Sequence, residues 1–155
     1  MNPRAPRSTA PAVPRSRLAA QGVLLDTGVL VALYARDDPW HRAASHWLAG
    51  FDGDLHTVEA VLTEAAFFLP ARQRAGLADL AHQGTLQVHQ SDAPAQARMA
   101  QLLRKYADLD PDWADITLVW LAENTGITRI ATLDVADFSA YRIHGRKKFA
   151  LELLR

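Results

Sequence analysis

Four acidic residues lie in segments that are otherwise apolar or that end an expected strand. They are Asp26 after residues 23–25, Glu64 inside the apolar segment 58–69, Asp115 between two apolar residues, and Asp134 shortly after residues 129–132. Burying a carboxylate costs free energy unless a partner compensates its charge. Asp26 alone is compatible with a helix cap, a structural ion pair, a nucleophile or a metal ligand.

The expected positions of these acids favour a shared site. Asp26 and Asp134 follow parallel strands, at the edge where ligand crevices form in open α/β sheets. Asp115 is expected in the first turns of a helix, where the helix dipole favours an anion. If the fold brings the four carboxylates together, their repulsion raises their pKa values or attracts a cation. Without cysteine or a His-x-x-x-His pair, such an oxygen-rich set favours Mg²⁺ or Mn²⁺ over zinc.

The elements that must position the acids alternate along the chain. Strands are expected at 23–25, 55–57, 85–89 and 129–132, with a last edge strand at 141–143. Helices are expected at 28–34, 38–48, 58–69, 72–83, 92–106 and from 110 to about 126. Thr27 is expected to cap the first helix and Asp110 the last, with Trp113 on the inner face of the last helix. This alternation predicts an α/β fold with a mostly parallel sheet.

Length and composition limit the remaining possibilities. The chain has 155 residues, of which 49% are hydrophobic, which fits one globular domain with its own core. Residues 1–21 contain arginines but no acid and are expected to form a flexible basic tail before a domain at 22–155. Basic and acidic residues balance at 17 each, so nucleic-acid binding would need a local basic patch. No apolar run approaches the roughly 20 residues of a membrane span, and the lack of cysteine fits a reducing cytoplasm.

Four sequence blocks follow one another in a recognisable order: VLLDTGVLVAL, VLTEAAFFL, YADLDPDWADITLVWLAE and RIATLDVADFSAYR. Across residues 22–155 they resemble the PIN domain and, more narrowly, the VapC-type ribonuclease toxins of toxin–antitoxin pairs. The resemblance implies a three-layer α/β/α fold with a mostly parallel central sheet. It also matches Asp26, Glu64, Asp115 and Asp134 to the family's catalytic acids.

By this resemblance, the protein is expected to be a Mg²⁺- or Mn²⁺-dependent endoribonuclease that hydrolyses RNA phosphodiesters. Asp26, Asp115 and Asp134 would bind the metal, and Glu64 would bind it or orient the attacking water. Asp112 and Asp137 lie three residues from Asp115 and Asp134 and are further candidate ligands. Contacts to the RNA, with tRNA and rRNA both open, are predicted at five residues: Thr27, Thr132, Arg36, Arg142 and Lys147.

The resemblance further implies a homodimer, an inhibitory cognate antitoxin and no membrane partner. Two alternatives stay open. A catalytically silent PIN-like module would bind RNA or a protein through the same fold. A phosphatase of the haloacid dehalogenase type also begins with an apolar strand and an aspartate, but its D-x-D-G-T motif needs a second aspartate where Gly28 stands.

Overall fold

The computed structural model describes residues 14–152. The predicted tail falls mostly outside these residues, but its last part is helical. Helix α1 (Arg15–Gln21) leads directly into the first strand, and its Leu18 packs against the hydrophobic core. Residues 15–21, which belong to the predicted tail, therefore form a helix whose Leu18 contacts the domain.

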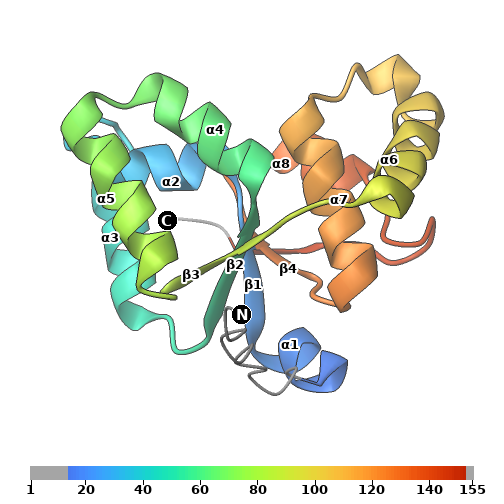
Figure 1. Ribbon diagram of the computed structural model, residues 1–155, viewed down its shortest axis with the longest axis horizontal. Helices are drawn as coiled ribbons and strands as arrows, with labels where there is room; N and C mark the ends of the chain where they lie inside the picture. The colour runs from blue at the N-terminus through green and yellow to red at the C-terminus, as the bar shows by residue number, and fades with distance from the viewer. Residues whose placement is uncertain (1–13, 153–155) are drawn as a thin grey trace, which may run out of the picture.

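A parallel sheet of five strands forms the centre of the described chain (Figure 1). The strands are β1 (Gly22–Leu25), β2 (Asp54–Val58), β3 (Leu86–His89), β4 (Arg129–Ala131) and β5 (Ala150–Glu152). Their order is β3-β2-β1-β4-β5, and every neighbouring pair is parallel. With helices on both sides, this sheet confirms the predicted three-layer α/β/α fold.

The helices divide into two groups around the sheet (Figure 1). The first group contains α2 (Thr27–Tyr34), α3 (His41–Gly50), α4 (Glu59–Phe68) and α5 (Ala71–His82). The second contains α6 (Ala93–Lys105), α7 (Trp113–Thr125) and α8 (Val135–Ala140), with a short 3₁₀ turn, η1 (Ala107–Leu109), between α6 and α7. Helices α4 and α7 face each other across the carboxyl ends of β1 and β2 (Figure 1). None of the described helices is long and apolar enough to cross a membrane.

The core explains why acids at these positions become buried. Strand β1 has no exposed residue, as its uniformly apolar sequence predicts. Helix α7 is buried from Ala114 to Val119 and ends at Gly126, whose φ of 80° is the left-handed conformation of a helix C-cap. Any side chain in the first turns of α7 that faces the sheet therefore lies in the protein interior.

Three local predictions are wrong. Helix α7 is capped by Asp112 rather than Asp110, because Asp110 takes a left-handed φ of 47° after η1. Trp113 consequently begins the helix on its outer side and is half exposed. The last strand is β5 rather than residues 141–143, since this segment makes only the isolated bridge from Ile143 to Lys147 and does not pair with the sheet.

Candidate active site

The four predicted acids meet in one cavity of about 730 Å³ at the carboxyl end of the sheet. Asp26, Glu64, Asp115 and Asp134 all line it, together with Asp112 and Asp38. They come from four separate elements: the ends of β1 and β4, the middle of α4 and the first turns of α7. The cavity therefore concentrates negative charge from segments that are far apart in the sequence.

Asp26 joins the end of β1 to the start of α2. Its backbone N–H donates to the carbonyl of Ala131 at 3.1 Å, which continues the pairing of β1 with β4. Its carboxylate caps α2 by accepting from Thr27 N at 2.7 Å, so the cap is Asp26 rather than the predicted Thr27. The second carboxylate oxygen accepts from Thr132 Oγ1 at 2.7 Å. Burial raises the pKa of Asp26 to about 6 despite these two hydrogen bonds.

Asp115 is the most perturbed acid of the site. It lies in the first turn of α7 with 5% of its surface exposed. Its Oδ2 accepts from the hydroxyl of Tyr141 at 3.2 Å, and its backbone N–H donates to the capping Asp112 at 2.7 Å. Burial, followed by repulsion from Asp26 and Asp112, raises the pKa of Asp115 to about 8. The carboxylates of Asp26 and Asp112 are therefore close enough to oppose the ionisation of Asp115.

Asp134 completes the set from the end of β4. Its carboxylate caps α8 by accepting from Asp137 N at 3.0 Å, and its own N–H donates to Thr132 Oγ1 at 2.9 Å. Thr132 therefore uses one hydroxyl to link Asp26 with the backbone of Asp134. One carboxylate oxygen from each of Asp115, Asp134 and Asp137 lies within 4.8 Å of the others, a spacing that one cation could bridge.

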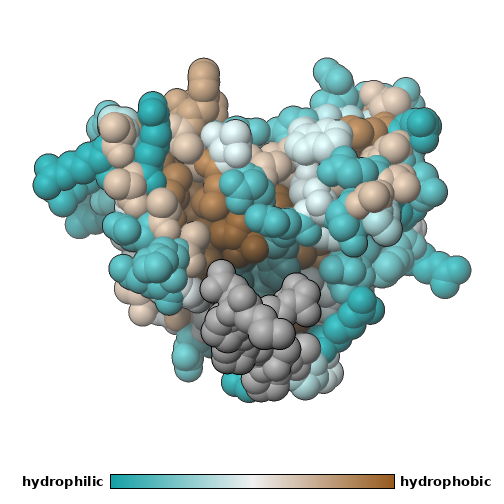
Figure 2. Space-filling model, viewed as in Figure 1, coloured by the Kyte–Doolittle hydropathy of each residue, from teal (hydrophilic) through white to brown (hydrophobic). Residues whose placement is uncertain are grey.

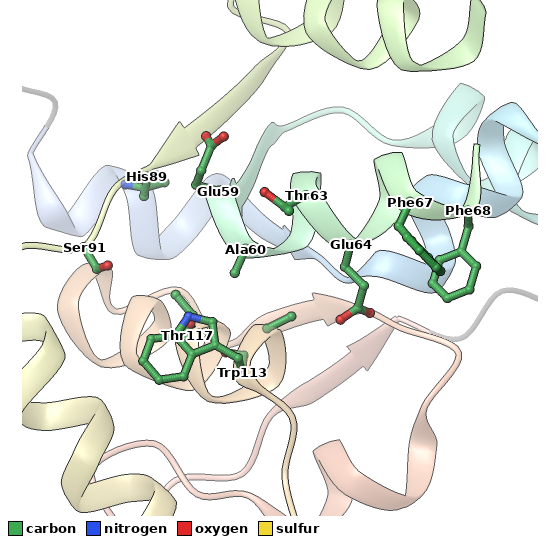
Figure 3. A pocket seen from close by; sticks show the side chains of 11 residues that line it. Glu59, Ala60, Thr63, Glu64, Phe67, Phe68, His89, Ser91, Trp113 and Thr117 are labelled. Atoms are coloured by element: carbon green, nitrogen blue, oxygen red, sulfur yellow. Dashed lines mark hydrogen bonds between the residues drawn. The ribbon is translucent and has the colours of Figure 1, made fainter. Parts of the chain in front are cut away.

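Glu64 approaches the same cavity from the opposite side. It is half buried in the middle of α4, and its charge contributes to the raised pKa of Asp26. Figure 3 shows its carboxylate pointing across the gap toward the start of α7. Its position matches the prediction that it completes the acidic cluster.

Residues predicted to contact RNA have varied environments. Thr27 lines the cavity, and its buried hydroxyl has no hydrogen-bond partner among the described residues. Thr132 is 1% exposed, and its hydroxyl donates to the Asp26 carboxylate and accepts from Asp134 N; its contact with RNA stays a prediction. Arg142 donates to the carbonyls of Ser139, Ala140 and Tyr141, and Lys147 lies in an exposed turn; neither lines the cavity.

Arg36, the fifth residue predicted to contact RNA, lines a neighbouring pocket between α2 and α5. Tyr141 is a site residue that the search for misplaced acids did not select. The available signal was its place in the block DFSAYR, where an aromatic follows Phe138 at the spacing of a buried helix end. Its buried hydroxyl orients Asp115.

An aromatic groove of about 700 Å³ adjoins the acidic cavity and shares Glu64 and Phe68 with it. Figure 3 shows Phe67 and Phe68 of α4 on one side of this groove and Trp113 of α7 on the other. These three aromatic residues are respectively 80%, 61% and 50% exposed. Figure 2 shows hydrophobic residues gathered near the centre of the face viewed in Figure 1. Exposed aromatic side chains that line a groove are typical of an interaction surface.

Comparisons with known proteins agree with this architecture. Residues 23–143 match the family described as the PIN domain. The chain is structurally similar to VapC20 of Mycobacterium tuberculosis, described as a sarcin–ricin loop cleaving toxin, with a TM-score of 0.68, 19% identity, and coverage of 74% of this chain and 91% of that one. It is also similar to VapBC2 from Rickettsia felis, solved bound to a DNA fragment from its promoter, with a TM-score of 0.60, 14% identity, and coverage of 85% and 98%. The comparison with curated protein sequences gave no match. At these identities, the structural similarity shows the fold.

Proposed function

Because the match over residues 23–143 shows that the chain belongs to the PIN domain family, we propose that it is a metal-dependent endoribonuclease and the toxin of a toxin–antitoxin pair. The observation that carries this proposal is the convergence of four carboxylates, from four elements, on one cavity. Phosphate and carboxylate repel each other, so an acidic cavity can receive RNA only if cations neutralise it.

The residues of the cavity fit Mg²⁺ or Mn²⁺. The donors are carboxylate oxygens, which these cations prefer, and the buried hydroxyl of Thr27 lines the cavity without a partner among the described residues. Asp26, Asp115 and Asp134 would hold the metal, with Glu64, Asp112 and Asp137 as further ligands. A cation bound there supplies a water of lowered pKa and stabilises charge on the phosphoryl oxygens.

The chain's own residues would orient the reacting groups. The hydroxyl of Thr132 holds the Asp26 carboxylate at the strand end, and the Tyr141 hydroxyl holds that of Asp115. Glu64, on the opposite side of the cavity, would orient the attacking water. As the water oxygen bonds to phosphorus, the water gives up a proton, the bond from phosphorus to the leaving ribose oxygen breaks, and this oxygen takes up a proton.

A protein partner is the second part of the proposal. The aromatic groove beside the acids has the exposure and shape to receive an apolar peptide segment. Because the structurally similar VapC20 is described as a toxin, and toxins of this type are paired with an antitoxin, we assign this groove to a cognate antitoxin that would cover the acidic cavity. The active form would be a homodimer that acts on tRNA or rRNA in the cytoplasm.

Induced expression of the wild type and of Asp26→Asn tests the nuclease. We expect the wild type alone to arrest growth and to generate discrete RNA ends, with the sarcin–ricin loop included among the sites mapped. The purified wild type should cleave the same RNA with Mg²⁺ and stop when EDTA is added.

Equal growth and intact RNA for both proteins would defeat the nuclease proposal. If RNA then still bound without cleavage, the catalytically silent PIN-like module would be the better description. The PIN match gives no support to the phosphatase alternative, whose motif Gly28 already breaks.

A further inference from the structure

A pocket of about 670 Å³ lies between the end of α2 and the start of α5, next to the acidic cavity. Its lining is mainly polar and contains no carboxylate: Leu33, Tyr34, Arg36, His41, Arg72 and Gln73. Two guanidinium groups on different elements therefore face a common space. Such a pair matches an anion with several oxygens, such as a phosphate.

The two arginines differ from the nearby Arg74 in their interactions. Arg74 Nε donates to the carbonyls of Ala66 and Leu69 at 2.8 and 2.7 Å, so its guanidinium helps to close the end of α4. Arg36 and Arg72 are exposed, and within residues 14–152 neither makes a side-chain hydrogen bond or an ion pair. Their charges are therefore available to a ligand.

The walls of the pocket are fixed by contacts that do not use the arginines. The hydroxyl of Tyr34 donates to the carbonyl of Gly76 at 3.0 Å, which ties α2 to α5. A Cβ at Gly76 would lie 2.7 Å from the Tyr34 ring, so this close approach requires glycine. His41 Nδ1 lies 2.7 Å from the carbonyl of Ala32, which requires that this nitrogen carry the proton and donate. The pocket is thus preformed.

The pocket is joined to the acidic cavity by the chain itself. Val31 and Asp38 line the cavity, whereas residues 33, 34, 36 and 41 of the same segment line the pocket. The acidic site lies at the start of α2 and the pocket lies at its end. Since α2 has eight residues, the rise per residue of a helix places the two sites about 10–12 Å apart. At the axial spacing of phosphates along a stacked strand, this distance corresponds to about three nucleotides.

We propose that the pocket lined by Arg36 and Arg72 binds a backbone phosphate of the RNA strand, a few nucleotides from the phosphate cleaved at the acidic site. The proposal rests on the proposed ribonuclease function for the identity of the strand. The phosphate subsite would hold the RNA in register while the acids themselves contribute no attraction to it. Because phosphate contacts carry no base information, this subsite would raise affinity without selecting sequence.

The test uses single-stranded RNA octamers of random sequence, labelled with a fluorophore, and the Asp26→Asn protein as a non-cleaving parent. Arg36→Gln and Arg72→Gln are combined in this parent. The matched control combines Arg15→Gln and Arg104→Gln, which remove the same charge from exposed positions on α1 and α6. Fluorescence anisotropy gives the dissociation constant at several salt concentrations, and thermal unfolding checks that both variants are folded.

We expect the Arg36/Arg72 variant to bind about tenfold more weakly, and the slope of log K against log salt to fall by about 0.7 for the lost phosphate contact. The control should stay within about twofold of the parent, because only screened long-range charge has changed. An octamer with an uncharged methylphosphonate backbone should bind the Arg36/Arg72 variant and the control variant with the same dissociation constant.

Equal RNA binding by parent and variant, or an equal loss in the control, would overturn the subsite. So would an oligoglutamate peptide that binds the pocket with the same arginine dependence and more tightly than RNA, since the natural ligand would then be an acidic protein segment. Cleavage by the wild type in Mg²⁺ is measured separately. If cleavage is absent while the octamer depends on Arg36 and Arg72, the nuclease proposal fails and the phosphate subsite stands.

Discussion

The two sides of the acidic cavity are built differently. On one side, Asp26, Asp115 and Asp134 lie at the ends of strands or in the first turn of a helix, and each carboxylate accepts hydrogen bonds from the protein. We call these three residues the fixed wall. On the other side, Glu64 lies in mid-helix, one turn before the exposed Phe67 and Phe68. We call these three residues the α4 wall.

The difference means that the fixed wall is preorganised, whereas the α4 wall can adapt to a ligand. Carboxylates held by backbone N–H and hydroxyl donors keep their geometry without a ligand, which suits groups that must bind a metal in one arrangement. Glu64 has no side-chain hydrogen bond within the described part of the chain, so it can change rotamer when a metal, water or partner arrives. The fixed wall should therefore dominate metal binding, and the α4 wall should respond to ligands.

The largest effect is expected from Asp115→Asn. This change removes a proposed metal-binding carboxylate from the fixed wall and should reduce RNA cleavage by about 10³-fold or more, comparable with losing a main electrostatic contribution to the transition state. The loss of cleavage rate caused by Glu64→Gln should be about tenfold smaller than that caused by Asp115→Asn, because water can partly replace the Glu64 side chain. Initial cleavage rates across a Mg²⁺ titration measure both. A greater loss for Glu64→Gln would reverse the ranking of the two walls.

Thr132→Val tests the link within the fixed wall. It removes the hydroxyl between Asp26 and Asp134 and keeps the side-chain shape, so metal affinity or activity should fall by about 10–100-fold. Thr125→Val is the control, since Thr125 is also buried and bonds within its own helix, to the carbonyl of Leu121. It should lower the unfolding temperature without changing activity per folded molecule. Equal activity losses in both variants would indicate a general packing defect.

The pH dependence of stability sharpens the comparison further. The folded-state pKa of Asp115, about 8, exceeds the unfolded value, so the folded metal-free protein binds more protons. This contribution to stability is complete below about pH 4 and is lost as the pH rises to and beyond 8. Thermal unfolding in EDTA between pH 6.5 and 9 should show it, and Asp115→Asn should be more stable than wild type at pH 9 by about 1–3 kcal/mol.

His56 and His89 contribute little above pH 6.5. Burial lowers the pKa of His56 to about 4 and also lowers that of His89, so both are neutral throughout that range. A parallel pH dependence in wild type and Asp115→Asn would contradict the assignment to Asp115. Added Mg²⁺ should abolish the loss of wild-type stability at high pH, because a bound cation compensates the ionised carboxylate.

The smallest effect on the isolated protein is expected from Phe67→Ser in the α4 wall. Its side chain is 80% exposed, so the free energy of unfolding should change by less than about 0.5 kcal/mol and cleavage should persist. Binding of a co-expressed antitoxin should weaken, and copurification measures this. Leu109→Ser is the control, because Leu109 is also an exposed hydrophobic residue but lines neither the groove nor the acidic cavity. Unchanged antitoxin binding by Phe67→Ser would remove the groove from the proposed interface.

The sequence predicted the fixed wall where a local pattern determined position. An apolar run followed by an acid indicates a strand end, and parallel strands place their carboxyl ends at one edge, which is why Asp26 and Asp134 meet. The same reasoning predicted the wrong start for α7. Asp110-Pro111 has the sequence of a helix start, but the turn η1 uses Asp110, and Asp112 then provides the cap.

Sequence periodicity could not predict contacts between side chains that are far apart in the chain. Thr132 and Tyr141 bond to acids that are 106 and 26 residues away, and no spacing rule links them. The phosphate pocket likewise depends on how α2 and α5 pack, which Tyr34 and Gly76 determine in three dimensions. The sequence therefore predicted which acids lie together, and the packing shows which neighbours form hydrogen bonds with them.

The strand order has a consequence for when the protein becomes active during its synthesis. Strand β1 pairs with β4, so Leu25 lies beside Ala131, and Asp26 depends on a hydroxyl supplied by residue 132. A nascent chain that ends before residue 132 lacks both this neighbour and Asp134, although Asp26 and Glu64 have already been made. Because such long-range pairings form late, the proposed active site cannot assemble until residues 132–134 have been synthesised.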